Sequence, residues 1–453
     1  MSDIISGYFG PPKLKFKCAF HNTIYDVLLN RGLREVTGES DLSWDIFWCE
    51  KDWIREVFDK VHLSSNQKVN HFRNHFMLTR KDNLAKFIRK AKREAEKDGR
   101  IQEAKKFDII PQTFLLPTEY SLFVEHFKKE QVAGTRNIYI AKPIGRSQGK
   151  GIFLFDRLAS IGEWRQTFAS SMSAGGAPIQ TPAIAGSNAA IGSGCLDDED
   201  GTATSTEPYV TQRYIQNPLL IGGKKFDMRL YGLVTSYSPL SMWIYRTGFA
   251  RFAHTRYALN KETLDNTTMH LTNVAVQKKA DNYDAEIGGK WDLNRMRIFL
   301  KSVYGDAAIE ELFVNLEQIM IYAVKAVQKA IIQDPHCFEL YGFDVMVDDQ
   351  LRPWLLEVNA SPSLSANTTE DYWVKYGLLD DVVTVLDIEG RGLVTQETLR
   401  VGGFDAVVRN NELVPRKRST LGTVNERREQ IRQLCEARRP ARSKARMPDD
   451  EVE

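Results

Sequence analysis

The chain has 453 residues, 42% of them hydrophobic and 10% aromatic, and its formal net charge at pH 7 is +2. This length predicts about two or three globular domains with ordinary cores. The near balance of acidic and basic residues excludes a protein that binds polyanions through its overall charge, so charge has to be considered segment by segment.

The beginning of the chain predicts a small domain followed by a helical segment. Residues 1–80 combine short strand-like runs with aromatic clusters such as SWDIFWCEKDW, which indicates a small N-terminal α/β domain. Over residues 81–100, apolar residues recur at helical spacing among many lysines and arginines, and Gly99 marks the end of the pattern. We therefore expect one basic amphipathic helix there, within a helical segment at 81–140.

The middle of the chain predicts a strand-rich core. Residues 141–387 contain β-branched and aromatic runs bounded by Gly and Pro, among them GIFLF, YVTQRYI, FDMRLYGLVTSY and SMWIYR. Between two of these runs lies Ser170–Glu207, which is rich in Ala, Gly, Ser and Thr. Because this stretch cannot bury much apolar surface, we expect a disordered insertion at 170–207. Beyond the core we expect an extension at 388–408 and a basic, flexible tail at 409–453.

The cysteines and the hydrophobic pattern bear on the compartment. The five cysteines are widely separated: Cys18, Cys49, Cys195, Cys337 and Cys435. Because no two of them form a CxxC pair, a zinc module or a disulfide framework is disfavoured and a reducing compartment is favoured. The first residues lack the features of a signal peptide, and no segment has the roughly 20 apolar residues that cross a bilayer. We expect a soluble, intracellular protein.

The most informative stretch is FELYGFDVMVDDQLRPWLLEVNASPSL, in which two strand-like runs flank the turn-rich DDQLRP. If this hairpin is symmetric about its two central residues, Asp344 faces Glu357 on the partner strand. Asn359 shares the face of Glu357, because strand side chains alternate. Three oxygen ligands without a nearby Cys or His suit Mg²⁺, and carboxylates this close repel each other unless a cation separates them. The alternative is an ordinary salt-bridged pair of sheet residues.

A glycine-rich loop lies earlier in the core. NIYIAKPIGRSQGKGIFLF places Lys142 at the end of one strand and Gly145–Gly151 in a loop before the next. This strand–loop–strand order disfavours a P-loop NTPase, and the absence of HRD and DFG disfavours a protein kinase. The loop can still cover phosphates, because glycine lets backbone N–H groups approach anions closely. An ordinary flexible hairpin is the alternative.

A charged strand face follows in QRYIQNPLLIGGKKFDMRLYGLV. Lys225, Asp227 and Arg229 are spaced two apart, so they share one face of a strand that is otherwise apolar. Such charges seldom lie among core residues without a partner or a ligand, which leaves a binding site or an ion-pair network. The preceding run Gln212–Ile215 can present backbone groups and an apolar face to a flat base such as adenine.

Two histidines are spaced four residues apart. His71 and His75 suggest a metal pair, but no carboxylate of the HExxH kind accompanies them in the sequence. We therefore favour a structural role for both.

In this order, the motifs resemble the tubulin–tyrosine-ligase-like family, whose catalytic core is similar to an ATP-grasp fold. The resemblance covers roughly residues 16–408 and rests on HFRNHFMLTRKDNL, AKPIGRSQGKGIFLF, NPLLIGGKKFDMRLYGLV, HLTNVAVQK, GGKWDLNRMR and WLLEVNASPSL. The chain looks most like the short polyglutamylases of that family. This implies an α+β fold, with an ATP-grasp-like catalytic core whose antiparallel sheets sandwich the nucleotide, preceded by the small N-terminal α/β domain.

The resemblance implies nucleotide-binding roles along the core. The ATP phosphates would be held by Lys142, Gln148 and Gly149. The adenine pocket would be lined by Gln212, Arg213, Tyr214 and Ile215, and the ribose would lie toward Lys225 and Asp227. The nucleotide site would be completed by Thr272 and Asn273.

It also implies roles in metal and substrate binding. The magnesium ligands would be Asp344, Glu357 and Asn359. The incoming glutamate would be held by Arg251 and Lys290, whose charge suits a substrate with two carboxylates. The γ-phosphate and the acceptor carboxylate would be faced by Arg229 and Arg246.

The implied activity is that of an ATP- and Mg²⁺-dependent tubulin polyglutamylase. ATP phosphorylates the γ-carboxylate of an acceptor glutamate, and the amino group of free L-glutamate then displaces phosphate from the acyl phosphate. One alternative is a tubulin glycine ligase, although glycine has no side-chain carboxylate for Arg251 and Lys290. A second is a non-catalytic axonemal or basal-body binding subunit, although such a protein needs no metal ligands.

The implied partners are acidic. The C-terminal tails of tubulin would be attracted by the basic helix at 81–100 and by the basic tail, unless both are merely solvated faces. Accessory subunits are expected, as for short relatives, whereas nucleic acid and membranes are not. The resemblance points to the cytoplasm and cytoskeleton, and to the axoneme or basal body of cilia and flagella.

Overall fold

The computed structural model describes residues 14–133, 137–161, 208–278, 289–362 and 368–427, together with residues 429 and 433. The predicted insertion at 170–207 and most of the predicted basic tail lie outside these residues. The chain divides into two compact units: unit 1 comprises Met1–Ile109, Asp227–Arg251 and Asp284–Glu453, and unit 2 comprises Ile110–Phe226 and Phe252–Tyr283. The finer division expected from the sequence stays a prediction.

Unit 1 begins with a small parallel sheet. Its strand order is β2-β1-β3-β4, and its strands are β1 (Lys15–Cys18), β2 (Arg34–Glu35), β3 (Ile46–Trp48) and β4 (Lys68–Val69). The connecting helices are α2 (Thr23–Asn30), α3 (Lys51–Glu56) and η1 (Phe58–Lys60). Parallel strands joined through helices are the arrangement that a small α/β segment requires.

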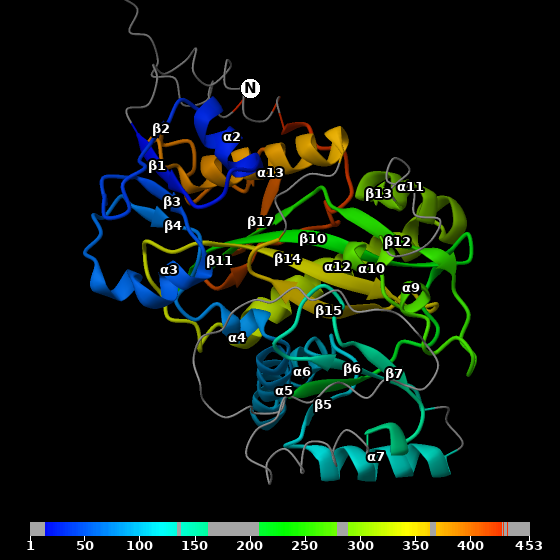
Figure 1. Cartoon of the computed structure of the whole chain (residues 1–453). Helices are drawn as coiled ribbons and strands as arrows, with labels where there is room; N and C mark the ends of the chain where they lie inside the picture. The colour runs from blue at the N-terminus through cyan, green and yellow to red at the C-terminus, as the bar shows by residue number, and fades with distance from the viewer. Residues whose placement is uncertain are drawn as a thin grey trace, which may run out of the picture. The chain divides into compact units, whose positions relative to one another are not determined.

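A ten-stranded sheet forms the centre of the chain. Its main path is β13-β12-β10-β11-β17-β16, and β14 pairs with both β10 and β15. Its strands are β9 (Leu220–Ile221), β10 (Lys224–Tyr237), β11 (Leu240–Tyr245), β12 (Phe249–Arg256), β13 (Lys290–Asp292), β14 (Glu339–Val347), β15 (Pro353–Asn359), β16 (Arg400–Val401), β17 (Phe404–Arg409) and β18 (Glu412–Leu413) (Figure 1). The pairs that β14 makes with β10 and β15 are antiparallel.

Helices cover both faces of this sheet in unit 1. The long helices are α5 (Lys81–Lys97), α11 (Leu293–Tyr304), α12 (Asp306–Val327) and α13 (Thr369–Leu386), and the short ones are α4 (Phe76–Thr79) and α6 (Ile101–Lys105). Helix α5 confirms the predicted basic helix, and the chain leaves it through Gly99 at a φ of +73°. On one face, a Cβ at Gly232 of β10 would lie 3.4 Å from Met320 of α12.

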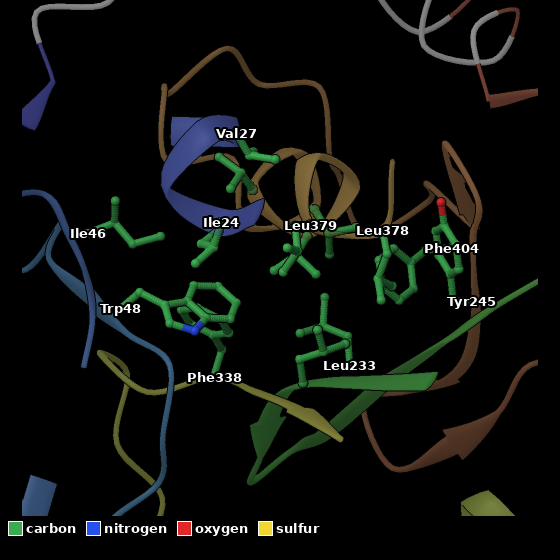
Figure 2. Packing of buried hydrophobic residues seen from close by; sticks show 14 of the residues in the cluster. Ile24, Val27, Ile46, Trp48, Leu233, Tyr245, Phe338, Leu378, Leu379 and Phe404 are labelled. Carbon is green, nitrogen blue, oxygen red and sulfur yellow. The ribbon is translucent and has the colours of Figure 1, made fainter. Parts of the chain in front are cut away.

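The opposite face packs against α2 and α13. Figure 2 shows Leu378 and Leu379 of α13 and Ile24 of α2 pointing toward Leu233 of the sheet. All four side chains are fully buried. This face carries Tyr231 and Leu233 of β10, so the packing of α13 fixes which side chains of β10 lie beneath it.

Unit 2 is built on a four-stranded antiparallel sheet of order β5-β8-β6-β7. Its strands are β5 (Thr113–Leu116), β6 (Tyr139–Pro143), β7 (Phe153–Phe155) and β8 (Tyr209–Arg213), and its helices are α7 (Tyr120–Val132), α9 (Thr267–His270) and α10 (Val274–Gln277). One face buries aromatic residues of α7, and the other buries Ile140, Tyr214 and Leu271.

Helices mixed with largely antiparallel sheets agree with the expected α+β class. Among the described residues, no helix combines the length and the apolar character that a membrane span requires.

Candidate active site

The predicted acidic hairpin forms, and it brings the expected pair together. In the antiparallel pairing of β14 with β15, Asp344 lies opposite Glu357 and Gly342 lies opposite Asn359. The side-chain amide of Asn359 lies 3.4 Å from Asp344 Oδ2 and 3.4 Å from Glu357 Oε1. The three oxygen-bearing side chains therefore converge on one sheet face.

Two arginines hold the Asp344 carboxylate. Arg229 lies directly opposite it on β10, and its Nε and Nη2 donate to Oδ1 and Oδ2 at 2.5 and 3.0 Å. Nη2 of Arg251 lies 3.0 Å from Oδ2. Although burial opposes ionisation, the two guanidinium groups hold the pKa of Asp344 well below its usual range. Asp344 is thus an ionised carboxylate that needs no proton loss to bind a cation.

This donor set fits a magnesium ion. A half turn of the Asn359 amide places its oxygen where its nitrogen now lies, next to both carboxylates. Two carboxylates and one amide oxygen are hard ligands, and Mg²⁺ commonly takes one or two carboxylates and keeps its other positions for water and phosphate. Glu357 and Asn359 are only half-buried, so the face remains accessible.

Cationic side chains continue along the same face. Arg251 on β12 donates from Nε and Nη2 to Asp227 of β10 at 2.8 and 2.5 Å. Its direct neighbour across the strand pair is Lys290 of β13. The Lys290 ammonium lies 3.4 Å from Oδ2 of Asp371 and 4.9 Å from the centre of the Phe249 ring. Together with Asp344, one face of the sheet thus carries the predicted residues Asp227, Arg229, Arg251 and Lys290.

In unit 2, Lys142 is held by a chain of hydrogen bonds. Its ammonium donates to Oε1 of Gln212 at 2.9 Å, and Nε2 of Gln212 donates to Oγ1 of Thr113 at 3.0 Å. Lys142 and Gln212 lie on the face of the small sheet that carries Ile140 and Tyr214. The predicted strand–loop–strand order is confirmed, because β6 and β7 form the hairpin that encloses the glycine-rich loop.

The glycine-rich loop lies against the segment that contains Thr272 and Asn273. Gly149 has a φ of +79°, and a Cβ there would lie 2.7 Å from Val276 and 3.7 Å from Oδ1 of Asn273. Only glycine fits this approach without a shift. Thr272, which directly precedes Asn273, is buried. Gln148 in the loop has a φ of +60° and an exposed side chain.

Tyr214 and Lys225 form a buried polar pair. The Lys225 ammonium donates to the Tyr214 hydroxyl at 2.8 Å and to the backbone oxygen of His270 at 2.8 Å. The hydroxyl of Tyr214 also lies 2.9 Å from Nδ1 of His270. Burial raises the pKa of Tyr214 well above its usual value, so its hydroxyl stays protonated.

Two predicted arginines have partners that the sequence does not suggest. Arg213 follows Gln212 and so points to the opposite face, where it donates to Glu130 at 2.6 Å. Arg246 is buried and donates to both oxygens of Asp405, at 2.6 and 2.8 Å. Ile215 follows the end of β8 and is half-buried. The binding roles of all three stay predictions.

The two histidines gain a carboxylate from β14. Nδ1 of His71 lies 2.6 Å from Oε1 of Glu339, and the Phe72 backbone N–H donates to Oε2. The possible ligand atoms of His71, His75 and Glu339 lie within 4.8 Å of one another. Burial raises the pKa of Glu339 to about 8 and lowers that of His71 to about 3. His71 and Glu339 bond each other in forms that burial favours as uncharged, and His75 Nδ1 lies 3.0 Å from the backbone oxygen of Phe72. These contacts support the structural interpretation.

Three residues that the sequence did not single out contact the predicted residues of the two units. In unit 1 they are Asp371 and Lys375 of α13, whose carboxylate and ammonium lie 2.9 Å apart. Their only sequence signal is their (i, i+4) spacing, which any helix surface can carry. In unit 2 the missed residue is His270, which directly precedes the Leu-Thr-Asn run in HLTN.

Comparisons with known proteins agree on one family. The model of the "Tubulin-tyrosine ligase family" matches residues 60–392. Probable tubulin polyglutamylase TTLL9 of Mus musculus is 45% identical over 441 residues, which is 93% of this chain and 92% of that protein. Probable tubulin polyglutamylase ttll-9 of Caenorhabditis elegans is 43% identical over 89% of this chain and 86% of its own length. Probable alpha-tubulin polyglutamylase Ttll1 of Tetrahymena thermophila is 37% identical over 87% and 92%.

Proposed function

Because the chain belongs to the tubulin-tyrosine ligase family, we propose that it is a tubulin polyglutamylase, a ligase that joins L-glutamate to glutamate side chains of tubulin. The names of its relatives support this activity. The observation that carries the proposal is the convergence of Asp344, Glu357 and Asn359 on one face, with Arg229 beside them.

These residues would hold the metal, and unit 2 would hold the nucleotide. Asp344, Glu357 and Asn359 would bind Mg²⁺, which supplies charge neutralisation for phosphoryl transfer from ATP when both are bound. The nucleotide would lie near Lys142, the glycine-rich loop and Tyr214. Enclosure of the nucleotide by antiparallel sheets of an ATP-grasp core, with a separate N-terminal α/β domain, belongs to the same proposal.

The remaining charged residues would bind the two carboxylate substrates. Arg229 would face the acceptor γ-carboxylate and the γ-phosphate, so that the acyl phosphate forms where charge is neutralised. Arg251 and Lys290 would hold the carboxylates of free glutamate, whose amino group then attacks. Glycine lacks the second carboxylate, which disfavours a glycine ligase.

The acceptor and the location follow from the same proposal. The acceptor would be the acidic C-terminal tail of tubulin, and the setting would be the cytoskeleton, with cilia and flagella as its expected sites. Accessory subunits would assist the chain, as expected for the short relatives in this family.

Substitution of Glu357 tests the proposal. Glu357→Gln should abolish transfer of labelled glutamate to tubulin, since it removes a metal ligand, whereas Glu412→Gln on the exposed strand β18 should leave transfer intact. Incorporation should be measured with purified protein, tubulin and accessory subunits. Equal activity of wild type and Glu357→Gln would refute the proposed site.

Two further outcomes separate the alternatives. If labelled glycine is incorporated in preference to glutamate, the glycine-ligase alternative holds. If the wild-type protein shows no Mg²⁺-dependent ATP binding by calorimetry, the non-catalytic binding subunit is favoured.

A further inference from the structure

We infer that Asp371 is a positioning residue, which holds Lys290 in place for the dicarboxylic amino acid. This inference rests on the proposed function, because Lys290 is the residue proposed to bind glutamate. Asp371 lies on α13, outside every motif that the sequence singles out.

The first turn of α13 fixes Asp371 firmly. Thr368 caps the helix, and its hydroxyl accepts the backbone N–H of Asp371 at 3.1 Å. The next residue, Tyr372, donates from its hydroxyl to Asp26 of α2 at 2.8 Å. A capped turn that is also tied to a neighbouring helix gives the Asp371 carboxylate little freedom.

One oxygen of this carboxylate contacts two ammonium groups. Oδ2 of Asp371 lies 2.9 Å from Nζ of Lys375 and 3.4 Å from Nζ of Lys290. The Asp371 and Lys375 side chains are 6% and 5% exposed, whereas Lys290 is 24% exposed. Asp371 and Lys375 thus form a buried ion pair, and the more exposed Lys290 contacts the same Asp371 oxygen.

Lys290 needs a fixed ion-pair partner if its ammonium is to stay in one position. A lysine side chain has four flexible bonds, and an exposed ammonium without a fixed acceptor samples many rotamers. Lys290 is the cross-strand neighbour of Arg251, and Phe249 lies beneath its ammonium. The contact with Asp371 selects the rotamer in which both cations point to the same face, as recognition of two carboxylates requires.

Kinetics with matched variants test the inference. Asp371→Asn keeps the shape but removes the charge, and it should raise KM for glutamate about tenfold, as expected for loss of a charge-assisted hydrogen bond. KM for ATP and kcat should change less than about twofold, because the metal ligands are untouched. Glu412→Gln, which removes an exposed carboxylate that takes no part in this contact, should leave KM for glutamate unchanged. Asp371→Glu should restore part of the loss.

A second measurement does not depend on activity. Reductive ¹³C-methylation of the lysines allows the Lys290 side chain to be observed by NMR, with Lys290→Arg used to assign the signal. Loss of the Asp371 charge should increase the mobility of the Lys290 methyl groups, because the ammonium then lacks its fixed acceptor. This result remains available if a variant is inactive.

The outcomes separate the inference from the proposed function. If wild-type protein transfers glutamate while Asp371→Asn leaves both KM for glutamate and the mobility of the Lys290 side chain unchanged, the inference is wrong. The same holds if kcat falls with KM unchanged. If wild-type protein transfers no glutamate, the proposed function fails, and the NMR measurement alone decides whether Asp371 holds Lys290.

Discussion

Asp344 combines a structural and a chemical task in one carboxylate. It is 2% exposed and receives hydrogen bonds from Arg229, whose own side chain is almost buried. Removal of one partner from a buried arginine–carboxylate pair strongly destabilises the protein, because the other charge is left uncompensated. The same arginines favour the ionised form of Asp344, which its proposed role as a metal ligand requires. Variants at Asp344 and at the half-buried Glu357 can be compared to separate its structural role from its proposed role in metal binding.

Asp344→Asn should therefore impair folding as well as metal binding. It leaves Arg229 and Arg251 facing a neutral amide, so the free energy of unfolding should fall by about 3–5 kcal/mol. Mg²⁺-dependent binding of ATP should also be lost. Urea unfolding and calorimetry measure the two effects. Glu357→Gln should lose the same metal-dependent binding with a clearly smaller loss of stability, and equal losses in the two variants would contradict this division of roles.

The pH dependence of this effect has a definite sign. Because the arginines depress the pKa of Asp344 in the folded state, its contribution to stability is complete above the unfolded pKa of about 4. The contribution is lost only as the pH falls through the folded-state pKa. The stability difference between wild type and Asp344→Asn should thus stay constant between about pH 5 and pH 8 and shrink in acid. A difference that varies across this neutral window would show that another group titrates with Asp344.

At single positions, alternation along strands was predictable but long-range pairing was not. Spacing alone places Asp227 and Arg229 on one face, as the structure confirms through their contacts. Asp371 escapes such reasoning because it is 81 residues from Lys290, on a helix that meets β13 only through tertiary packing. The ion pair of Arg246 with Asp405 spans 159 residues and is invisible for the same reason.

Among the elements, the β14–β15 hairpin shows two departures from symmetry that cancel. Val347 pairs with Pro353, so the turn is centred on Gln350 and not between two residues. Continued without interruption, that register would place Asp344 opposite Leu356. An irregularity between Asp344 and Val345 shifts the pairing by one residue and restores Glu357. The expected pair is therefore correct, although the sequence does not reveal the bulge that produces it.

In the loop between β6 and β7, we expect position 149 to require glycine. Gly149→Ala would add a Cβ 2.7 Å from Val276 at a φ of +79°, so the loop must move away from the Leu271–Val276 segment. If the loop covers phosphates, ATP binding should weaken at least about tenfold, because backbone N–H groups lose their alignment. Isothermal calorimetry measures this loss.

Gly222→Ala provides the matched control for this substitution. Gly222 also has a positive φ, +60°, but nothing lies within 4 Å of its added Cβ. It should carry only the backbone cost of about 1 kcal/mol and leave ATP binding unchanged. Equal loss of ATP affinity in both variants would assign the effect to backbone strain and not to the loop's contact.

For the molecule as a whole, the small net charge conceals a basic surface on α5. Lys90 forms an exposed ion pair with Glu94 at 3.8 Å, and the exposed ammonium of Lys86 lies 3.7 Å from the buried carboxylate of Asp82. Such pairs contribute little to stability, typically about 0–1 kcal/mol, so their cations remain able to attract a polyanion. On the proposed function, this surface would favour association with acidic tubulin tails.

Charge reversal on α5 should therefore affect tubulin and not the small substrates. Replacement of Lys86, Lys90 and Arg93 by Glu should raise KM for microtubules several-fold at low salt and flatten its salt dependence, because screening has less attraction to remove. KM for ATP should not change. Steady-state kinetics at several salt concentrations measure both. An unchanged salt dependence would mean that these cations form an ordinary solvated face.

Metal removal tests whether nucleotide binding depends on the predicted magnesium ligands. A ligand that binds only the folded protein at about one hundred times its Kd adds about 2.7 kcal/mol, which should raise Tm by a few degrees. ATP with Mg²⁺ should produce this shift in wild type, and chelation by EDTA should abolish most of it, because nucleotide phosphates then lose the cation that Asp344 and Glu357 are proposed to hold. Glu357→Gln should behave with Mg²⁺ as wild type behaves with EDTA. A shift that persists in EDTA would mean that nucleotide binding depends on Lys142 and its neighbours alone, and that the acidic face of β14 and β15 serves another purpose.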